Sequence, residues 1–229
     1  MARLILWDVD GTLIHSAGLG AAAFDRALEE VLGRAPESRI FLSGKTDPQI
    51  VREYLQHMGV HDADHHFPAV LAAVEAQVSA TAAELKERGN AQPGVGELLA
   101  RLGEVDGVHQ TLLTGNTAAN AAVKVKAFGL DRWLDLEIGA YGSDHADRRE
   151  LVPIARERAR RLRGLEVAPA ETWVVGDTAN DLACARAGGA CCLLVGTGRM
   201  GADELAALEP DAVLPDLSDT ELVVRLLLG

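Results

Sequence analysis

Cysteines and aromatic residues are scarce in this chain of 229 residues, which has three cysteines, three tryptophans, two tyrosines and four phenylalanines. Cys184, Cys191 and Cys192 have neither the C-x-x-C spacing nor the clustered histidines of a zinc site. We interpret them as small core residues in a protein of a reducing compartment. Because 48% of residues are hydrophobic but only 4% are aromatic, aliphatic side chains must fill the interior.

Positive charge is also scarce. The chain has 22 lysines and arginines against 34 acidic residues, and its net charge is −12. A surface of this charge repels a phosphate backbone, which argues against nucleic-acid binding. A site for a small anionic substrate must then be made locally positive by a metal, by helix N-termini and by a few basic side chains. Long apolar runs are missing too, so we expect no signal peptide, no membrane span and a cytoplasmic location.

Two carboxylates stand at the end of the first apolar run, in the segment Asp8-Val9-Asp10-Gly11-Thr12-Leu13. Side chains at i and i+2 of a strand lie on one face, so Asp8 and Asp10 can reach the same small volume. Such a pair is costly unless a cation shares it or one member holds a proton. The pattern predicts a hard divalent metal, an acid/base pair, or both. Mg²⁺ fits best because it prefers oxygen ligands and keeps waters that a phosphate can displace.

Polar side chains also end two later apolar runs. Thr114 precedes Gly115-Asn116 and an alanine-rich helical stretch, so its hydroxyl and the next N–H groups form an anion site at a helix N-terminus. Asp177 ends another run and could complete the ligand set begun by the first carboxylate pair, and Asp181 would start the following helix near the metal. Each of these residues alone is equally consistent with a helix cap. Together they favour a metal and phosphate site.

Alternating short apolar strands and helices predict an α/β fold with an open parallel sheet covered by helices on both faces. The expected strands are Leu4–Val9, His109–Thr114, Leu134–Ile138, Thr172–Val175, Ala190–Val195 and Ala212–Leu214. In such sheets ligands bind at the carboxyl ends of the strands, and the polar residues described above fall at those ends.

About a hundred residues separate the first two expected strands, which is too many for a simple crossover. The interval holds three helical patterns that each end at a glycine, Ala17–Leu32, Pro48–Met58 and Phe67–Arg88. We therefore expect a core domain of residues 1–15 and 93–229 with an inserted helical domain of residues 16–92. The polar segment between the second and third patterns is interpreted as a solvated loop rather than a transition-metal site, although it contains His61, Asp62, Asp64, His65 and His66.

Three segments resemble sequence motifs of the haloacid dehalogenase (HAD) superfamily. Asp8–Thr12 is similar to the first motif in its phosphatase form, Thr111–Asn116 to the second and Val174–Asp181 to the fourth, in the same order along the chain. The resemblance implies a HAD-like Rossmannoid core with a C1-type helical cap that closes over the active site. It also implies a Mg²⁺-dependent phosphatase for a small phosphate monoester, nearest to the phosphoglycolate phosphatase-like group.

The resemblance also implies a role for each motif residue. Asp8 would be the nucleophile that forms an aspartyl-phosphate, and Asp10 would protonate the leaving alcohol and then deprotonate the attacking water. The expected metal ligands are Asp8, Asp10 through its backbone carbonyl, Asp177 and Asp181. The residues expected at the substrate phosphate are Gly11, Thr12, Thr114, Gly115 and Asn116, with Thr114 counted as catalytic.

The third motif departs from the family pattern, which has a lysine ahead of the fourth motif. Here the corresponding segment offers only Arg148 and Arg149. We favour Arg148 as the catalytic cation, because an arginine can hold a carboxylate or a phosphoryl oxygen in bidentate fashion. The alternative is that both arginines are surface charges. The nearest upstream lysines, Lys124 and Lys126, are expected on a solvated helical face.

Lys45 lies in the polar loop Leu42–Pro48 of the expected cap, where the family places a specificity loop. It could bind an anionic group of the substrate, and the alternative is a solvated turn in which Thr46 or Asp47 caps the next helix.

Other functions remain open at this point. A phosphomutase shares all the motifs and differs in how the cap admits a second phosphate while excluding water. A phosphonoacetaldehyde hydrolase would use Lys45 as a Schiff-base lysine, but that class and the dehalogenases lack the second aspartate, so Asp10 counts against both. A non-catalytic binding protein would be favoured by loss of Asp8 or Asp10. The expected partner is a small phosphorylated metabolite, and the expected assembly is a monomer or homodimer.

Overall fold

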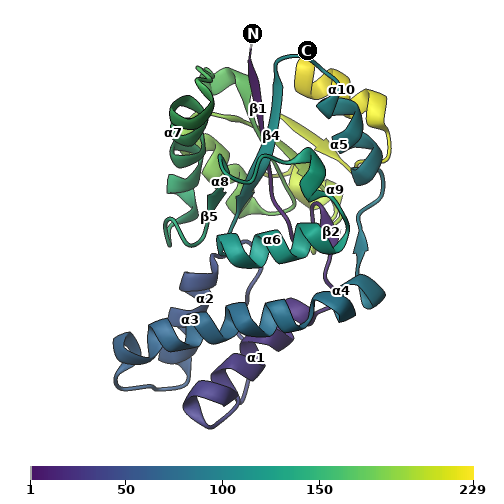
Figure 1. The fold of residues 1–229 in the computed structure, drawn as a ribbon. Helices are drawn as coiled ribbons and strands as arrows, with labels where there is room; N and C mark the ends of the chain where they lie inside the picture. The colour runs from purple at the N-terminus through teal and green to yellow at the C-terminus, as the bar shows by residue number, and fades with distance from the viewer. Residues whose placement is uncertain (1) are drawn as a thin grey trace.

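A six-stranded parallel sheet forms the centre of the molecule, which is described here for residues 2–229 by a computed structural model (Figure 1). Its strand order is β5-β4-β1-β6-β7-β8. The strands are β1 (Arg3–Trp7), β4 (Val108–Thr114), β5 (Ala140–Tyr141), β6 (Thr172–Gly176), β7 (Cys191–Val195) and β8 (Ala212–Leu214). The predicted α/β fold class is confirmed.

Both faces of the sheet are buried, which explains why its strands form continuous apolar runs. In β1, Ile5 and Trp7 pack into one hydrophobic cluster, whereas Leu4 and Leu6 pack into the cluster on the opposite face. The first face is covered by α5 (Val95–Gly103), α6 (Ala118–Ala127) and α10 (Thr220–Leu228), and the second by α7 (Leu151–Arg163) and α8 (Ala179–Gly188). A short helix, α9 (Ala202–Ala206), follows β7.

The strand expected at Leu134–Ile138 is wrong, because the edge strand is the shorter β5 at Ala140–Tyr141. The alternating Leu-Asp-Leu-Glu-Ile pattern mimics a half-buried strand. Instead, the carboxylate of Asp135 accepts a hydrogen bond from the N–H of Glu137 at 3.2 Å and closes a turn. Leu134 and Ile138 are buried as the pattern suggests, but from a loop.

Four helices form a separate layer at one end of the sheet, and their bounds are α1 (Leu19–Leu32), α2 (Asp47–His57), α3 (Ala63–Ala80) and α4 (Ala82–Arg88). Helices α1, α2 and α3 share a hydrophobic cluster of their own around Phe24, Tyr54 and Val74. The chain enters and leaves this insert through the short antiparallel strands β2 (Ile14–His15) and β3 (Asn90–Ala91).

The third helical pattern differs from the expectation in two respects. Helix α3 begins at Ala63, so His65 and His66 lie on a helix rather than in a loop. The single helix expected over Phe67–Arg88 is broken at Thr81, whose hydroxyl donates to the carbonyl of Val78 at 2.8 Å. Such bonding to the preceding turn competes with helix propagation.

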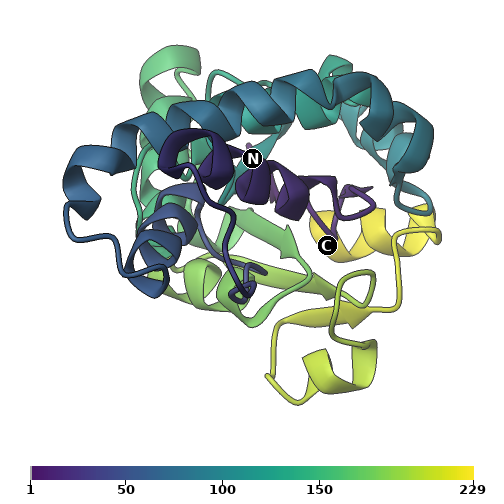
Figure 2. The same cartoon turned by 90° about the horizontal axis from the view of Figure 1, so that it is seen from below.

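The carboxyl ends of the strands point toward the helical insert, as Figure 1 shows. Viewed from below, the helices α1 and α3 both lie in front of this end of the core (Figure 2). The residues that end β1, β4 and β6 therefore lie between the two layers. Every helix within residues 2–229 is too short or too polar to span a lipid bilayer.

Candidate active site

Three buried carboxylates meet at the carboxyl ends of the central strands. Asp8 follows β1, Asp177 follows the neighbouring β6, and Asp181 lies in the first turn of α8. One carboxylate oxygen from each lies within 4.8 Å of the other two. Strand adjacency thus brings together residues that are about 170 positions apart in sequence, and an all-oxygen set of this kind suits a hard divalent cation.

The pKa values of the clustered carboxyls are raised, which shows that too little positive charge surrounds them. Burial raises the pKa of Asp8 to about 6, with further contributions from Asp181 and Asp10 and an opposing one from Arg148. Burial also raises the pKa of Asp177 to about 8, and the charges of Asp8 and Asp181 act in the same direction. Carboxyls crowded in this way keep their protons unless a cation shares them. The donor set therefore fits a bound divalent metal.

Arg148 is the cation that the protein itself supplies to the cluster. It begins the short turn Arg148–Glu150 ahead of α7, and only 7% of its surface is exposed. One guanidinium nitrogen lies 3.0 Å from the carboxylate of Asp8 and is also paired with Asp181. Burial would lower the pKa of Arg148, but the two carboxylates more than offset this and raise it. Arg149 is exposed and pairs with Asp147, away from the cluster.

Asp10 points away from the carboxylate cluster, toward α6. Its carboxylate lies 2.5 Å from the ammonium of Lys124 and accepts a hydrogen bond from the amide of Asn116 at 2.9 Å. Burial would raise the pKa of Asp10, but the charge of Lys124 and these hydrogen bonds bring it below its usual value. Asp10 is therefore ionised in the absence of substrate.

The expectation that Lys124 lies on a solvated face is wrong. Lys124 is 6% exposed, whereas Lys126 is exposed as expected. A lysine is buried only when its charge is paired, and the Asp10 carboxylate and the Asn116 carbonyl oxygen at 2.6 Å provide that pairing. A usable signal was present, because Asn120 and Lys124 are spaced i and i+4 after the Thr117 helix cap and so share one face.

Thr114 and Asn116 lie beside Asp10 at the end of β4. The Thr114 hydroxyl accepts a hydrogen bond from the Asn116 side-chain amide at 2.8 Å. Gly115 is packed so closely against the insert that an added Cβ would lie 2.1 Å from the carbonyl oxygen of Lys45. Glycine is required here because the backbone of the insert approaches the core directly.

The other two residues expected at the phosphate take a different position. The Thr12 hydroxyl donates to the carboxylate of Asp177 at 3.1 Å, and Gly11 has φ +91° and would place a Cβ 2.4 Å from the same carboxylate. Gly11 and Thr12 therefore contact Asp177, and neither residue lines the cavity described below.

A cavity of about 260 Å³ lies between the core and the insert and opens onto Asp8. Pockets for drug-sized ligands have roughly 300–1,000 Å³, so this one suits a small metabolite. Residues of both layers line this cavity. The core contributes Asp8, Asp10, Thr114, Gly115, Asn116, Lys124, Arg148 and Arg199, and the helical insert contributes Ser16, Phe24, Leu42, Lys45, Asp47 and Ile50.

The loop between α1 and α2 is docked onto the core. Asp47 is buried and accepts hydrogen bonds from the N–H of Thr117 at 2.9 Å and the amide of Asn120 at 2.8 Å, and burial raises its pKa. Thr46 caps α2, whereas Asp47 accepts its hydrogen bonds from the first residues at the start of the core helix α6, which Thr117 caps. Lys45 lines the cavity and is paired with Glu53 of α2.

Comparison with known proteins identifies the family. The family model described as haloacid dehalogenase-like hydrolase matches residues 2–189. The chain belongs to the haloacid dehalogenase-like hydrolases. It is 30% identical over 226 residues to a phosphoglycolate phosphatase of Pseudomonas syringae pv. syringae, covering 95% of this chain and 78% of that one. It is 28% identical over 220 residues to the probable phosphatase IndB of Dickeya dadantii, covering 96% and 92%.

Solved structures show the same fold in this hydrolase family. The structure of CbbY from Rhodobacter sphaeroides in complex with phosphate aligns with a TM-score of 0.70 at 21% identity, over 96% of both chains. A predicted phosphoglycolate phosphatase from Haemophilus somnus aligns with a TM-score of 0.71 at 20% identity, over 97% of this chain and 98% of that one. The recognition of the family from its motifs is thus confirmed.

Proposed function

We propose that this protein is a Mg²⁺-dependent phosphatase that hydrolyses a small phosphate monoester through an aspartyl-phosphate on Asp8. One observation carries the proposal. The Asp8 carboxylate opens onto a small cavity, belongs to a buried acidic cluster and lies 3.0 Å from a buried guanidinium. The kinship with phosphoglycolate phosphatases supports a small substrate.

The metal would be held by Asp8, Asp177 and Asp181, with the backbone carbonyl of Asp10 as a further ligand. When bound, Mg²⁺ would offset the negative charges of the carboxylates and of the substrate phosphoryl group. Arg148 would hold the Asp8 carboxylate in place and contribute a second positive charge.

The chemistry of the remaining residues follows from their positions. An oxygen of Asp8 attacks phosphorus, the bond from phosphorus to the leaving oxygen breaks, and Asp10 gives that oxygen a proton. Water then attacks the phosphoryl group on Asp8, Asp10 takes its proton, and the acyl-phosphate bond breaks. The low pKa of Asp10 suits the base step. For the acid step, Asp10 must first take up a proton. The negative charge of the substrate phosphate would favour this, because it competes with Asp10 for Lys124 and repels the Asp10 carboxylate, and both effects raise the pKa of Asp10.

Residues 16–92 act in this proposal as a cap on the core domain of residues 1–15 and 93–229. Support comes from the separate hydrophobic cluster of the insert, the paired strands β2 and β3 at its base, and the docked loop at Asp47. The cap would keep bulk water from the aspartyl-phosphate and select the leaving group.

The test of the proposed function is turnover of a generic aryl phosphate by the purified protein. We expect hydrolysis with Mg²⁺ and loss of activity with a chelator, restored by excess Mg²⁺. Unchanged turnover in the presence of the chelator would contradict the proposal.

Metal binding should remove a pH-dependent loss of folding stability that we expect in the metal-free protein. A carboxyl whose pKa is raised on folding favours the folded state only while it is protonated, so this stability is lost as pH rises through the folded-state pKa. Because the pKa of Asp8 is raised from 3.8 to about 6 and that of Asp177 from 3.8 to about 8, the melting temperature of the metal-free protein should fall as pH rises from about 4 to about 8. Mg²⁺ should reverse the fall.

Asp177→Asn should abolish most of this pH dependence and most of the stabilisation by Mg²⁺, because it removes one buried carboxylate that is also an expected metal ligand. We expect a flatter pH dependence of the melting temperature without metal, and Mg²⁺ affinity lower by about tenfold or more, or about 1.4 kcal/mol. Thermal unfolding with and without Mg²⁺ measures both effects. The matched control is Asp147→Asn, whose carboxylate pairs with Arg149 outside the cluster. A variant Asp177→Asn with the wild-type response to Mg²⁺ would contradict the assignment.

Asp10→Asn should separate chemistry from metal binding. The substitution removes the proton donor and acceptor, and we expect kcat to fall by about 10²-fold or more. Mg²⁺ affinity should stay within about twofold, because the Asp10 side chain contacts Lys124 and Asn116 rather than the acidic cluster. Steady-state kinetics and calorimetric titration of Mg²⁺ give the two values. Loss of metal with unchanged turnover would reverse the assignment.

A further inference from the structure

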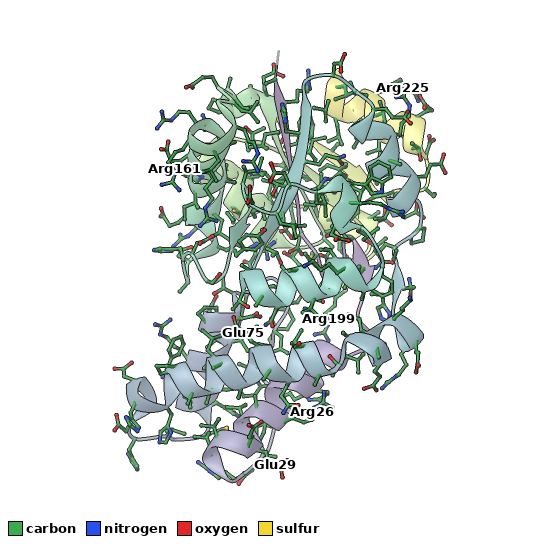
Figure 3. The ribbon with its side chains drawn as sticks, in the orientation of Figure 1. Arg26, Glu29, Glu75, Arg161, Arg199 and Arg225 are labelled. Atoms are coloured by element: carbon green, nitrogen blue, oxygen red, sulfur yellow. The ribbon has the colours of Figure 1, made fainter. Side chains whose placement is uncertain are left out.

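Arg199 lines the substrate cavity from the core loop between β7 and α9. Figure 3 shows it at the level between the core and the helical insert. Its guanidinium carbon lies 5.4 Å from the ring centroid of Phe41, which belongs to the insert and is 59% exposed. The ammonium of Lys45 lies 5.9 Å from the same centroid. Two cations that line the cavity thus both contact one aromatic ring.

The backbone around Arg199 is fixed next to the proposed metal site. The hydroxyl of Thr197 donates to the carbonyl of Gly11 at 2.6 Å, and the side chain of Gln92 donates to the carbonyl of Thr197 at 3.2 Å. At Gly198 an added Cβ would lie 1.7 Å from a carboxylate oxygen of Asp177. The loop is therefore held against the acidic cluster, and the Arg199 side chain reaches Phe41 of the insert from this position.

Arg199 differs from the other cations of the cavity in its charge partners. Arg148 is paired with Asp8 and Asp181, Lys124 with Asp10, and Lys45 with Glu53. Within residues 2–229, no carboxylate lies within ion-pairing distance of Arg199. Its positive charge is left available to a ligand.

Stacking on Phe41 does not use up the hydrogen-bonding capacity of the guanidinium. A cation–π contact engages the face of the planar group, whereas its N–H donors lie in the plane and point outward. Such an edge matches the two oxygens of a carboxylate or of a phosphate. Stacking also restricts the side chain, so less entropy is lost when an anion binds.

We propose that Arg199 determines substrate specificity by binding a second anionic group on the part of the substrate that leaves as the alcohol. This inference rests on the proposed phosphatase function. The second group is a carboxylate or a further phosphate, and the volume of about 260 Å³ restricts the spacer between the two anions to a few atoms.

The experiment compares three phosphate monoesters that are each built on a two-carbon chain. 2-Phosphoglycolate ends in a carboxylate, ethylene glycol bisphosphate ends in a phosphate, and ethyl phosphate has a neutral end. For Arg199→Ala we expect the ratio of kcat/KM between one of the anionic esters and ethyl phosphate to fall about tenfold or more, mainly through KM. The ester whose ratio falls identifies the anion. Arg199→Lys should recover part of the ratio, because the charge is kept while the planar fork is lost.

The matched control is Arg149→Ala, which removes an exposed arginine that does not line this cavity and should leave all three ratios unchanged. An equal loss of kcat/KM for all three esters, or no loss for any, would overturn the role of Arg199. So would a wild-type protein with no preference for either anionic ester. Turnover of an aryl phosphate tests the phosphatase function separately, and its absence in the wild type would overturn both proposals.

Discussion

Asp8→Asn is expected to lower kcat by about 10⁴-fold or more while the protein remains folded. An amide cannot attack phosphorus to form the covalent intermediate, and it is a poorer metal ligand than a carboxylate. Removal of a nucleophile that acts together with its neighbours typically abolishes the contribution of the whole group. Stability should not suffer, because burial and the neighbouring carboxylates already raise the pKa of Asp8 and make its ionised form costly.

Two measurements check this expectation. Steady-state turnover of an aryl phosphate gives the loss of rate, and acid quenching during turnover tests for a covalent phosphoryl group on the wild-type protein but not on the variant. Asp147→Asn serves as the control, because it removes a half-buried carboxylate that pairs with Arg149 outside the cluster. Full activity of Asp8→Asn would remove the covalent mechanism altogether.

The fold class could be predicted from the sequence because parallel strands that are buried on both faces appear as continuous runs of apolar residues. β1 and β6 carry that signal, and the acidic residues that follow them mark their carboxyl ends. The signal fails at the sheet edge. β5 has only two residues, and the more regular pattern around Asp135 belongs to a turn set by a side-chain hydrogen bond.

Part of the candidate site could be predicted from the sequence. Asp8 and Asp177 could be placed together from sequence because neighbouring parallel strands end at the same edge. For Lys124, the i, i+4 spacing with Asn120 indicates a shared helix face, but helical periodicity does not show what packs against that face. Asp47 begins α2 and Arg199 belongs to a loop, and what each side chain meets depends on the docking of the insert onto the core. Such tertiary placement leaves little trace in local sequence.

Arg148→Ala is expected to lower kcat by about 10³-fold or more, because it removes a buried cation that is in direct contact with both Asp8 and Asp181. Loss of a single preorganised donor to a developing charge costs about 10²–10³-fold, and here a buried full charge is lost as well. Arg149→Ala is the matched control, because this neighbouring arginine is exposed and pairs only with Asp147. It should behave as a surface change.

Stability must be separated from catalysis in this variant, since removing one partner of a buried ion pair costs about 3–5 kcal/mol. The melting temperature of Arg148→Ala should therefore fall, and it should recover in part with Mg²⁺ or at lower pH, where the orphaned carboxylates bind a cation or a proton. Arg148→Lys should fold and regain part of kcat, because the charge is kept while the planar guanidinium that bridges Asp8 and Asp181 is lost. If Arg148→Lys and a folded Arg148→Ala both keep the wild-type kcat, Arg148 is structural, and Lys124 beside Asp10 becomes the catalytic cation of the site.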